Sequence, residues 1–229
     1  MGILILVFLV GVAVFAYLNE VIVRLPKKEK LLGKSPHSSE KRSIRRLFIM
    51  LLGGVLAALV ILYYHFTPAA LTMFLLYSVL TVITFIDADT QEIPPVLNII
   101  IFVLGILSIW TMPGMPLLER IIGIFCISLP LYLIVIVIPD GFGGGDIKMM
   151  AAAGFFLGWK ATLVAFFIGV VMGGAYGAFL LIAKKSDKKA HFAFGPFLSV
   201  GIAISAYAGI GVTLMNHYLE PFKIMMQQM

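Results

Sequence analysis

The sequence predicts an all-α, polytopic integral membrane protein with about eight transmembrane helices. Of its 229 residues, 61% are hydrophobic and only 12% are charged, a balance far too apolar for a soluble domain of this size. A helix that crosses a bilayer needs about 20 mostly apolar residues, and runs of this kind fill most of the chain. We therefore expect residues 1–229 to form a single membrane-embedded domain.

Eight apolar runs are the candidate spans. In chain order they are Gly2–Val23, Leu47–Tyr64, Pro68–Phe85, Pro94–Trp110, Leu117–Ile138, Ile147–Leu157, Ala161–Ala183 and Phe192–Leu214. The sixth would form only about 17 Å of helix at 1.5 Å per residue, so we expect water or a thinned membrane at one of its ends. In the seventh, Gly169, Gly173 and Gly177 recur every four residues, and this flat stripe should press closely on another helix.

Basic residues gather in two loops, which predicts how the chain is oriented. Nine of the 17 lysines and arginines lie within residues 24–46, and four more lie within residues 184–189. Short loops rich in Lys and Arg stay in the cytoplasm, and eight crossings place both loops on that side. We expect residues 24–46 to form a basic cytoplasmic loop and the N-terminus to lie outside. No charge precedes the first apolar run, so we interpret this run as a retained anchor rather than a cleaved signal peptide.

The chain has eleven acidic residues, and two groups of them fall at the ends of predicted spans. Asp87, Asp89 and Glu92 follow the third span, while Asp140 and Asp146 flank a glycine run after the fifth. Both spans run from outside to inside in the predicted orientation, so both groups reach the cytoplasmic membrane face. Ionisable side chains at membrane depth are costly, and they are candidates for function for that reason.

Each of the aspartates also has a structural interpretation. Asp87 continues an apolar helix, and it could pair with Lys148 or lie at a solvated helix end. Asp146 precedes an apolar helix and could cap its N-terminus, where free backbone N–H groups favour a carboxylate. Asp89 lies about 200° around a helix from Asp87, so these two carboxylates cannot both face one point.

Two carboxyl groups from different spans, brought together, can hydrolyse a peptide bond. Repulsion between like charges keeps one carboxyl protonated while the other is ionised. The ionised group can take a proton from a water molecule as it attacks the carbonyl, and the neutral group can donate to the developing oxyanion. The lone Cys126 has no obvious histidine partner, and no cluster of histidines and carboxylates has metal-ligand spacing, so we expect no metal site.

The segments around both aspartates resemble the type IV prepilin peptidases, which are membrane aspartyl proteases of the GxGD class. Residues 87–94 (DADTQEIP) and 143–148 (GGGDIK) are similar to the two aspartate motifs of that family. Residues 18–26 (LNEVIVRLP) and 194–197 (FGPF) also look familial, and the four pieces follow in family order.

The resemblance implies that Asp87 and Asp146 are the catalytic pair of an aspartic-type endopeptidase. Other residues map to positions near the pair, where the resemblance implies tuning or substrate contact: Asp89, Glu92, Lys148, Gly143 and Gly145. It further implies a multi-pass protein of the inner (cytoplasmic) membrane whose active site faces the cytoplasm. There it would remove the short basic leader of pilin-like precursors, whose hydrophobic N-terminal helix lies in the lipid. Nucleic acid is not an expected partner.

The resemblance is to a short form of the family. Many bacterial members carry a cytoplasmic zinc domain with two cysteine pairs and methylate the new N-terminus with S-adenosylmethionine. Residues 24–46 contain no cysteine and cannot form that zinc site. We expect no cofactor for the peptidase, and S-adenosylmethionine only if methyl transfer is retained. Pro95 also stands where family members usually have aspartate or asparagine.

Other functions remain open on the sequence alone. An archaeal preflagellin peptidase would use the same chemistry on related precursors, and a non-catalytic membrane scaffold would need none of it. An ion- or proton-coupled transporter could use intramembrane aspartates. Such a transporter would be expected to keep them near the bilayer midplane, whereas these aspartates are predicted near one face.

Overall fold

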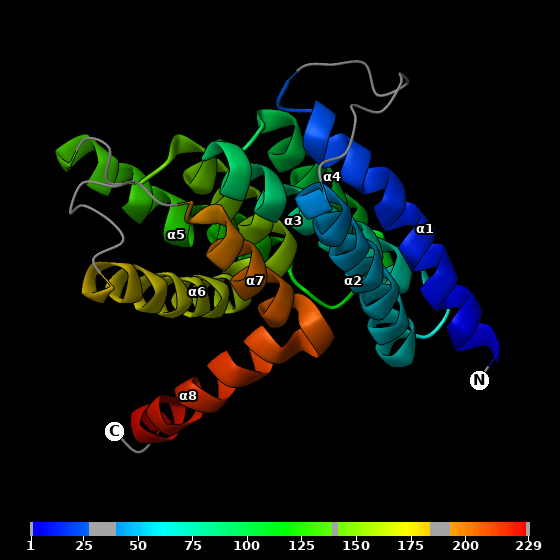
Figure 1. Ribbon diagram of the computed structural model, residues 1–229. Helices are drawn as coiled ribbons and strands as arrows, with labels where there is room; N and C mark the ends of the chain where they lie inside the picture. The colour runs from blue at the N-terminus through cyan, green and yellow to red at the C-terminus, as the bar shows by residue number, and fades with distance from the viewer. Residues whose placement is uncertain (1, 28–39, 139–141, 184–192, 228–229) are drawn as a thin grey trace.

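The computed structural model describes residues 2–27, 40–138, 142–183 and 193–227. Every regular element within these ranges is helical, so the all-α class is confirmed (Figure 1). The elements are α1 (Gly2–Arg24), α2 (Glu40–Tyr64), α3 (Pro68–Thr90), α4 (Pro95–Thr111), α5 (Leu117–Val137), α6 (Gly144–Ile182), α7 (Gly195–Ala206), the 3₁₀ turn η1 (Tyr207–Gly209) and α8 (Ile210–Gln227).

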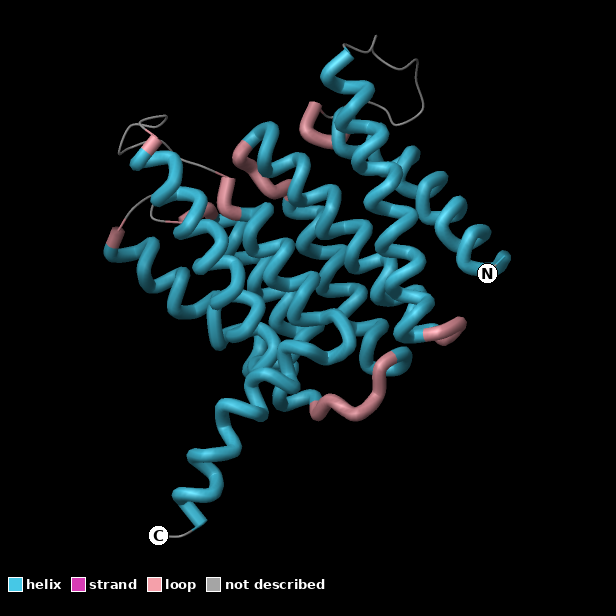
Figure 2. The backbone as a smooth tube through the Cα atoms, turned by 60° about the horizontal axis from the view of Figure 1, so that its bottom comes forward, coloured by secondary structure: helices cyan, strands magenta, loops and turns pink. Residues whose placement is uncertain are grey.

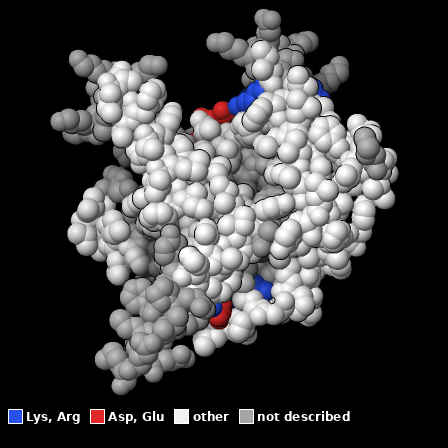
Figure 3. Space-filling view, turned by 90° about the horizontal axis from the view of Figure 1, so that it is seen from below, with Lys and Arg blue, Asp and Glu red and all other residues white. Residues whose placement is uncertain are grey.

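The described helices are those of a multi-pass membrane protein. Five of them are long and apolar enough to cross a bilayer, and a sixth is obtained if α7 and the first part of α8 count as one bent span. The predicted number was eight because it divided α6 in two and included α4, an apolar helix of 17 residues. Figure 3 shows charged side chains near two opposite edges of one face, with a wide uncharged surface between them, as a surrounding bilayer requires.

A glycine breaks α6 where the sequence predicts the boundary between the sixth and seventh spans. Gly158 has φ 72° and ψ 164°, a backbone conformation that side-chain-bearing residues rarely adopt. The helical segments on its two sides, residues 144–157 and 159–182, correspond to the two predicted spans. The first segment begins before Ile147, at Gly144, and so carries Asp146 within the helix.

The span predicted over Phe192–Leu214 is bent in the structure. Helix α7 ends at Ala206, and α8 continues at an angle of 79° to it after the η1 turn. Gly209 has φ 68°, which glycine supplies without steric cost. Figure 2 shows α8 projecting from the bundle with the C-terminus at its far end.

The basic segment predicted as a loop is partly helical. Helix α1 runs to Arg24, and α2 begins at Glu40, so residues 40–46 belong to a helix. Residues 28–39 and the second basic loop, residues 184–189, lie outside the described part of the chain.

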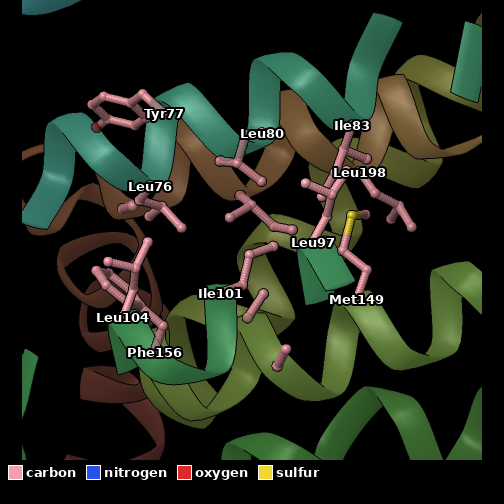
Figure 4. Packing of buried hydrophobic residues seen from close by; sticks show 14 of the residues in the cluster. Leu76, Tyr77, Leu80, Ile83, Leu97, Ile101, Leu104, Met149, Phe156 and Leu198 are labelled. Carbon is pink, nitrogen blue, oxygen red and sulfur yellow. The ribbon is translucent and has the colours of Figure 1, made fainter. Parts of the chain in front are cut away.

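Helix α3 is the centre of the bundle. Its most apolar window is 67% buried, against 28% or less for the other four helices of spanning length. Figure 4 shows its inward side chains meeting those of α4, α6 and α7. The labelled residues of this core are Leu76, Tyr77, Leu80, Ile83, Leu97, Ile101, Leu104, Met149, Phe156 and Leu198. A central α3 brings its last turn beside the N-termini of α6 and α7.

Glycines let α6 and α7 pack with their backbones close together, as the sequence predicts for this stripe. A Cβ atom on Gly169 would lie 3.3 Å from the Cα of Leu198, and one on Gly173 would lie 2.6 Å from the ring of Phe194. Gly201 of α7 faces the backbone carbonyl of Ala165 in the same way. These contacts place the N-terminus of α7 at the end of the bundle that holds the acidic residues.

Candidate active site

The two aspartates singled out by the sequence come together where α3 ends and α6 begins. Asp87 lies in the last turns of α3 and is 5% exposed, and Asp146 is the third residue of α6 and is 8% exposed. Their carboxyl groups are close enough to interact electrostatically. The fold therefore forms a buried carboxyl pair from two distant parts of the chain.

The end of α3 holds Asp87 on a helical turn rather than in a loop. The helix passes Phe85, where the predicted span ended, and continues to Thr90. The Thr90 hydroxyl donates to the Ile86 carbonyl at 2.9 Å. Gln91 then ends the helix with φ 56° and ψ 26°, and its N–H donates to the Asp87 carbonyl at 2.8 Å.

The carboxylate of Asp87 is held by the start of another helix. The backbone N–H of Gly195, the first residue of α7, donates to Asp87 Oδ2 at 2.9 Å. The positive end of the α7 dipole also lies at this position. A Cβ atom on residue 195 would come within 2.7 Å of the same oxygen, so the site requires glycine here. The sequence motif at residues 194–197 thus contributes a backbone donor to the pair.

Asp146 lies in the first turn of α6. The backbone N–H groups of Asp146 and Ile147 both donate to the Gly143 carbonyl, at 3.0 and 3.3 Å. Asp146 therefore lies inside the helix, about one turn beyond the capping position. The interpretation of Asp146 as the residue that caps the N-terminus is wrong. Asp146 Oδ1 is buried and has no hydrogen-bond partner among the described residues. The hydrogen-bonding capacity of this oxygen is therefore unused by the described residues.

Ile93 packs against the glycines that adjoin both aspartates. This buried residue lies in the turn between α3 and α4. A Cβ atom on Gly145 would lie 3.0 Å from Ile93 Cβ, and one on Gly195 would lie 3.2 Å from Ile93 Cδ1. The two glycines therefore let α6 and α7 close on the α3–α4 turn. Gly143 is exposed, and a Cβ atom there would lie 3.0 Å from Asp146 Oδ2.

Asp89 faces α2 rather than the pair. Both of its carboxylate oxygens accept hydrogen bonds from Arg45 Nη1, at 2.8 and 2.7 Å. The Arg45 guanidinium also lies 5.8 Å from the centre of the Phe85 ring. A cavity of about 530 Å³ adjoins this ion pair. Its lining residues come from the end of α1 and from α2 and α3: Ile22, Val23, Pro26, Lys27, Arg45, Asp89 and Thr90.

The remaining charged candidates, Glu92 and Lys148, are exposed at the same end of the bundle. Ion pairs among the described residues join Arg24 to Glu20, Arg45 to Asp89 and Lys160 to Glu119. The interpretation of Asp87 as the partner of Lys148 is therefore wrong. Within the same residues, no group of three or more His, Cys, Asp or Glu side chains is placed to bind a metal ion.

Sequence reasoning missed one polar residue beside the pair. Asn98 is 6% exposed in the first turn of α4, and its Nδ2 donates to the Gly145 carbonyl at 3.4 Å. A signal was present in the sequence, because Asn98 and Ser108 are the two polar residues of the run Pro94–Trp110. Polar groups inside spans are costly and mark candidate functional positions.

Comparison with known proteins identifies a family for this arrangement. The sequence profile of the Type IV leader peptidase family matches residues 74–178. The prepilin leader peptidase/N-methyltransferase of Neisseria gonorrhoeae is 35% identical over 177 residues, which cover 74% of this chain and 60% of that protein. The protein of the same name in Bacillus subtilis is 38% identical over 80 residues, covering 35% of this chain and 32% of its own length. That of Burkholderia pseudomallei is 29% identical over 185 residues, covering 78% of this chain and 60% of its own length.

No solved structure matches the chain significantly. The chain covers 60% or less of the length of each of these three relatives. The comparisons give no support to the transporter alternative. Residues 74–178 contain both Asp87 and Asp146, and this segment matches the type IV leader peptidase family.

Proposed function

We propose that this protein is an aspartic endopeptidase of the inner membrane that removes the leader of pilin-like precursors. The observation that carries the proposal is the buried pair of Asp87 and Asp146, which two helices bring together inside the segment that matches the family. The related proteins are named prepilin leader peptidases, which supports precursors of this class as substrates.

The surroundings of the two carboxyl groups support different roles for them. Asp87 accepts a backbone N–H from Gly195, and a hydrogen bond of this kind is strongest to an ionised carboxylate. Asp146 Oδ1 is buried without a partner, and a protonated carboxyl group avoids burying a second charge beside the first. We assign Asp87 as the general base and Asp146 as the general acid.

The reaction then follows from these two roles. Asp87 takes one proton from a water molecule while the water oxygen forms a bond to the scissile carbonyl carbon. Asp146 donates its proton to the carbonyl oxygen, which becomes the hydroxyl of a tetrahedral intermediate. When the C–N bond breaks, the proton held by Asp87 passes to the leaving nitrogen, and one hydroxyl group of the intermediate returns its proton to Asp146. One water is consumed, and a carboxylic acid and an amine are released.

The charge pattern supports a cytoplasmic position for the pair. The described ends of the basic segment, at Arg24 and at residues 40–46, adjoin α1 and α2, and the Arg45–Asp89 ion pair joins α2 to the turn that follows Asp87. Basic loops stay in the cytoplasm. A precursor whose hydrophobic helix lies in the bilayer would present its basic leader at this end, where Asp89, Glu92 and Lys148 are exposed and are proposed to tune the pair or contact the substrate.

The peptidase chemistry proposed here uses only side chains and water. The related proteins are also named N-methyltransferases, so S-adenosylmethionine is included as a variable in the test. Purified protein would be incubated with a candidate precursor, with and without S-adenosylmethionine, and the new N-terminus would be measured by mass spectrometry. We expect a shortened precursor in both reactions, and a mass increase of one methyl group only if methyl transfer is retained.

Asp87→Asn and Asp146→Asn test the pair directly. Each should lower the cleavage rate by about 10²–10⁴-fold or more, since each removes one proton-transfer group. Asp89→Asn is the comparison, because its carboxylate binds Arg45 on the exposed side of α3, and it should leave measurable activity. Cleavage at the normal rate by either of the first two variants would reject the assignment. Complete loss in Asp89→Asn with an active Asp87→Asn would show that the wrong aspartate had been chosen.

A further inference from the structure

Asn98 is a buried amide that does not cap its helix. It lies on the first turn of α4 and is 6% exposed. The N-cap residue of this helix is Pro94, and no side chain caps the helix. Asn98 instead points toward the start of α6, where Nδ2 donates to the Gly145 carbonyl at 3.4 Å.

The contact with Gly145 places Asn98 next to Asp146 in the chain. Gly145 directly precedes Asp146, and Ile93 packs against the same glycine. The peptide that carries Asp146 is therefore held by an apolar contact from the α3–α4 turn and a polar contact from α4. A change at Asn98 would loosen the first turn of α6 without removing either aspartate.

Two buried acceptor atoms adjoin this peptide without a donor. Asp146 Oδ1 and Asn98 Oδ1 both lack a hydrogen-bond partner among the described residues. Buried acceptors without a donor are costly, and ordered water commonly satisfies such groups. In the proposed reaction the attacking water lies beside Asp87, and its two hydrogens can go to the Asp87 carboxylate and to Asn98 Oδ1.

We propose that Asn98 is a positioning residue for the attacking water and for Asp146, an inference that rests on the proposed peptidase function. Its Nδ2 holds the Gly145 carbonyl and thereby the first turn of α6. Its Oδ1 accepts the hydrogen that the water retains, while the other hydrogen goes to Asp87. With both hydrogens of the water held, the lone pair of its oxygen points in one direction, toward the carbonyl carbon. No bond to Asn98 forms or breaks.

Two substitutions of nearly equal shape test this role. In Asn98→Thr a hydroxyl group can still donate or accept, whereas in Asn98→Val a methyl group occupies the same place. We expect Asn98→Val to lower kcat by about 10–100-fold with KM changed less than about twofold, because misplacement of reacting groups lowers the rate rather than ground-state binding. Asn98→Thr should recover at least about one third of the wild-type kcat.

A matched control makes the same hydroxyl-to-methyl change away from the pair. Thr162→Val alters a fully buried residue of α6 whose hydroxyl donates to the Gly158 carbonyl, beyond the glycine break. When equal amounts of folded protein are compared, Thr162→Val should have the same kcat as the wild type. Equal kcat in Asn98→Val and the wild type would overturn the proposal. Equal losses in Asn98→Thr and Asn98→Val would also overturn it, because the loss would then follow shape rather than hydrogen bonding.

Infrared spectroscopy separates this inference from the proposed function. The difference between the wild type and Asp146→Asn identifies the carboxyl band of Asp146, and this measurement needs no substrate. Asn98→Val should shift that band and its pH titration, and Asn98→Thr should leave them near the wild type. Failure of the wild type to cleave any precursor would reject the peptidase, whereas an unchanged Asp146 band in Asn98→Val would reject the role of Asn98.

Discussion

The glycines around Asp87 and Asp146 differ sharply in how much space they leave. At Gly195, a Cβ atom would lie 2.7 Å from Asp87 Oδ2, and this contact is with the group that the Gly195 N–H holds. At Gly144, no atom lies within 4 Å of a Cβ atom. Alanine at position 144 therefore tests the loss of a glycine alone, whereas alanine at position 195 also places a methyl group against the Asp87 carboxylate.

At the residue scale, Gly195→Ala is predicted to impair catalysis selectively. The added methyl group must displace the Asp87 carboxylate or the start of α7, and a displacement of about 1 Å can cost about 10²-fold in rate. Gly144→Ala is the control and should stay within about twofold of the wild type. Peptide cleavage by the two purified variants, compared at equal amounts of folded protein, provides the measurement. A Gly195→Ala variant as active as Gly144→Ala would contradict the close contact.

Helix α5 and the first segment of α6 touch at two glycines. A Cβ atom on Gly123 would collide with the Gly154 carbonyl, and one on Gly154 would collide with the Gly123 carbonyl. A buried arginine supports the same region, since Arg120 donates to Ser108 Oγ at 2.6 Å and to the Phe155 carbonyl at 3.3 Å. Arg120 thus joins α5 to α4 and to the part of α6 that precedes the Gly158 break, where carbonyl groups lack helical partners.

At the element scale, Gly154→Ala is predicted to destabilise the bundle by about 1–3 kcal/mol, the usual cost of overpacking a core. Gly174→Ala makes the same change in the same helix where no atom lies within 4 Å. It should be neutral or stabilise the protein by up to about 1 kcal/mol, because alanine favours a helix over glycine. Thermal unfolding in one detergent would compare them. An equal or higher midpoint for Gly154→Ala would show that α5 and α6 do not pack this closely.

At the scale of the whole molecule, charged side chains gather at the two ends of the bundle. The pair, Arg45 and Asp89 share one end, while the ion pair of Glu119 and Lys160 lies where α5 begins. The sequence predicts the first end in the cytoplasm from the clustering of basic residues. The arrangement of the helices is compatible with this orientation, which remains a prediction.

Labelling of single cysteines would test the orientation. In a Cys126→Ala background, which removes the one native cysteine, Lys27→Cys and Pro113→Cys place an exposed thiol at the two ends. A membrane-impermeant maleimide should label Pro113→Cys in intact spheroplasts. It should label Lys27→Cys only after the cytoplasmic face has been opened. The reverse pattern would place the pair outside and reject cleavage at the cytoplasmic face.

The sequence by itself determined the all-α membrane class, most helix boundaries, the break near Gly158 and the two acidic groups. These features are local, because the bilayer offers no hydrogen-bond partners and each apolar run must form its backbone hydrogen bonds within its own helix. The bend after Ala206 was missed, since the apolar run continues through it without interruption.

Only the tertiary structure decided which groups meet the two aspartates. The Gly195 N–H on Asp87, the packing of Ile93 against Gly145, and the hydrogen bond from Asn98 all join segments far apart in the chain. No period or motif spacing encodes such contacts. They arise when helices pack closely enough for one backbone to reach a side chain of another.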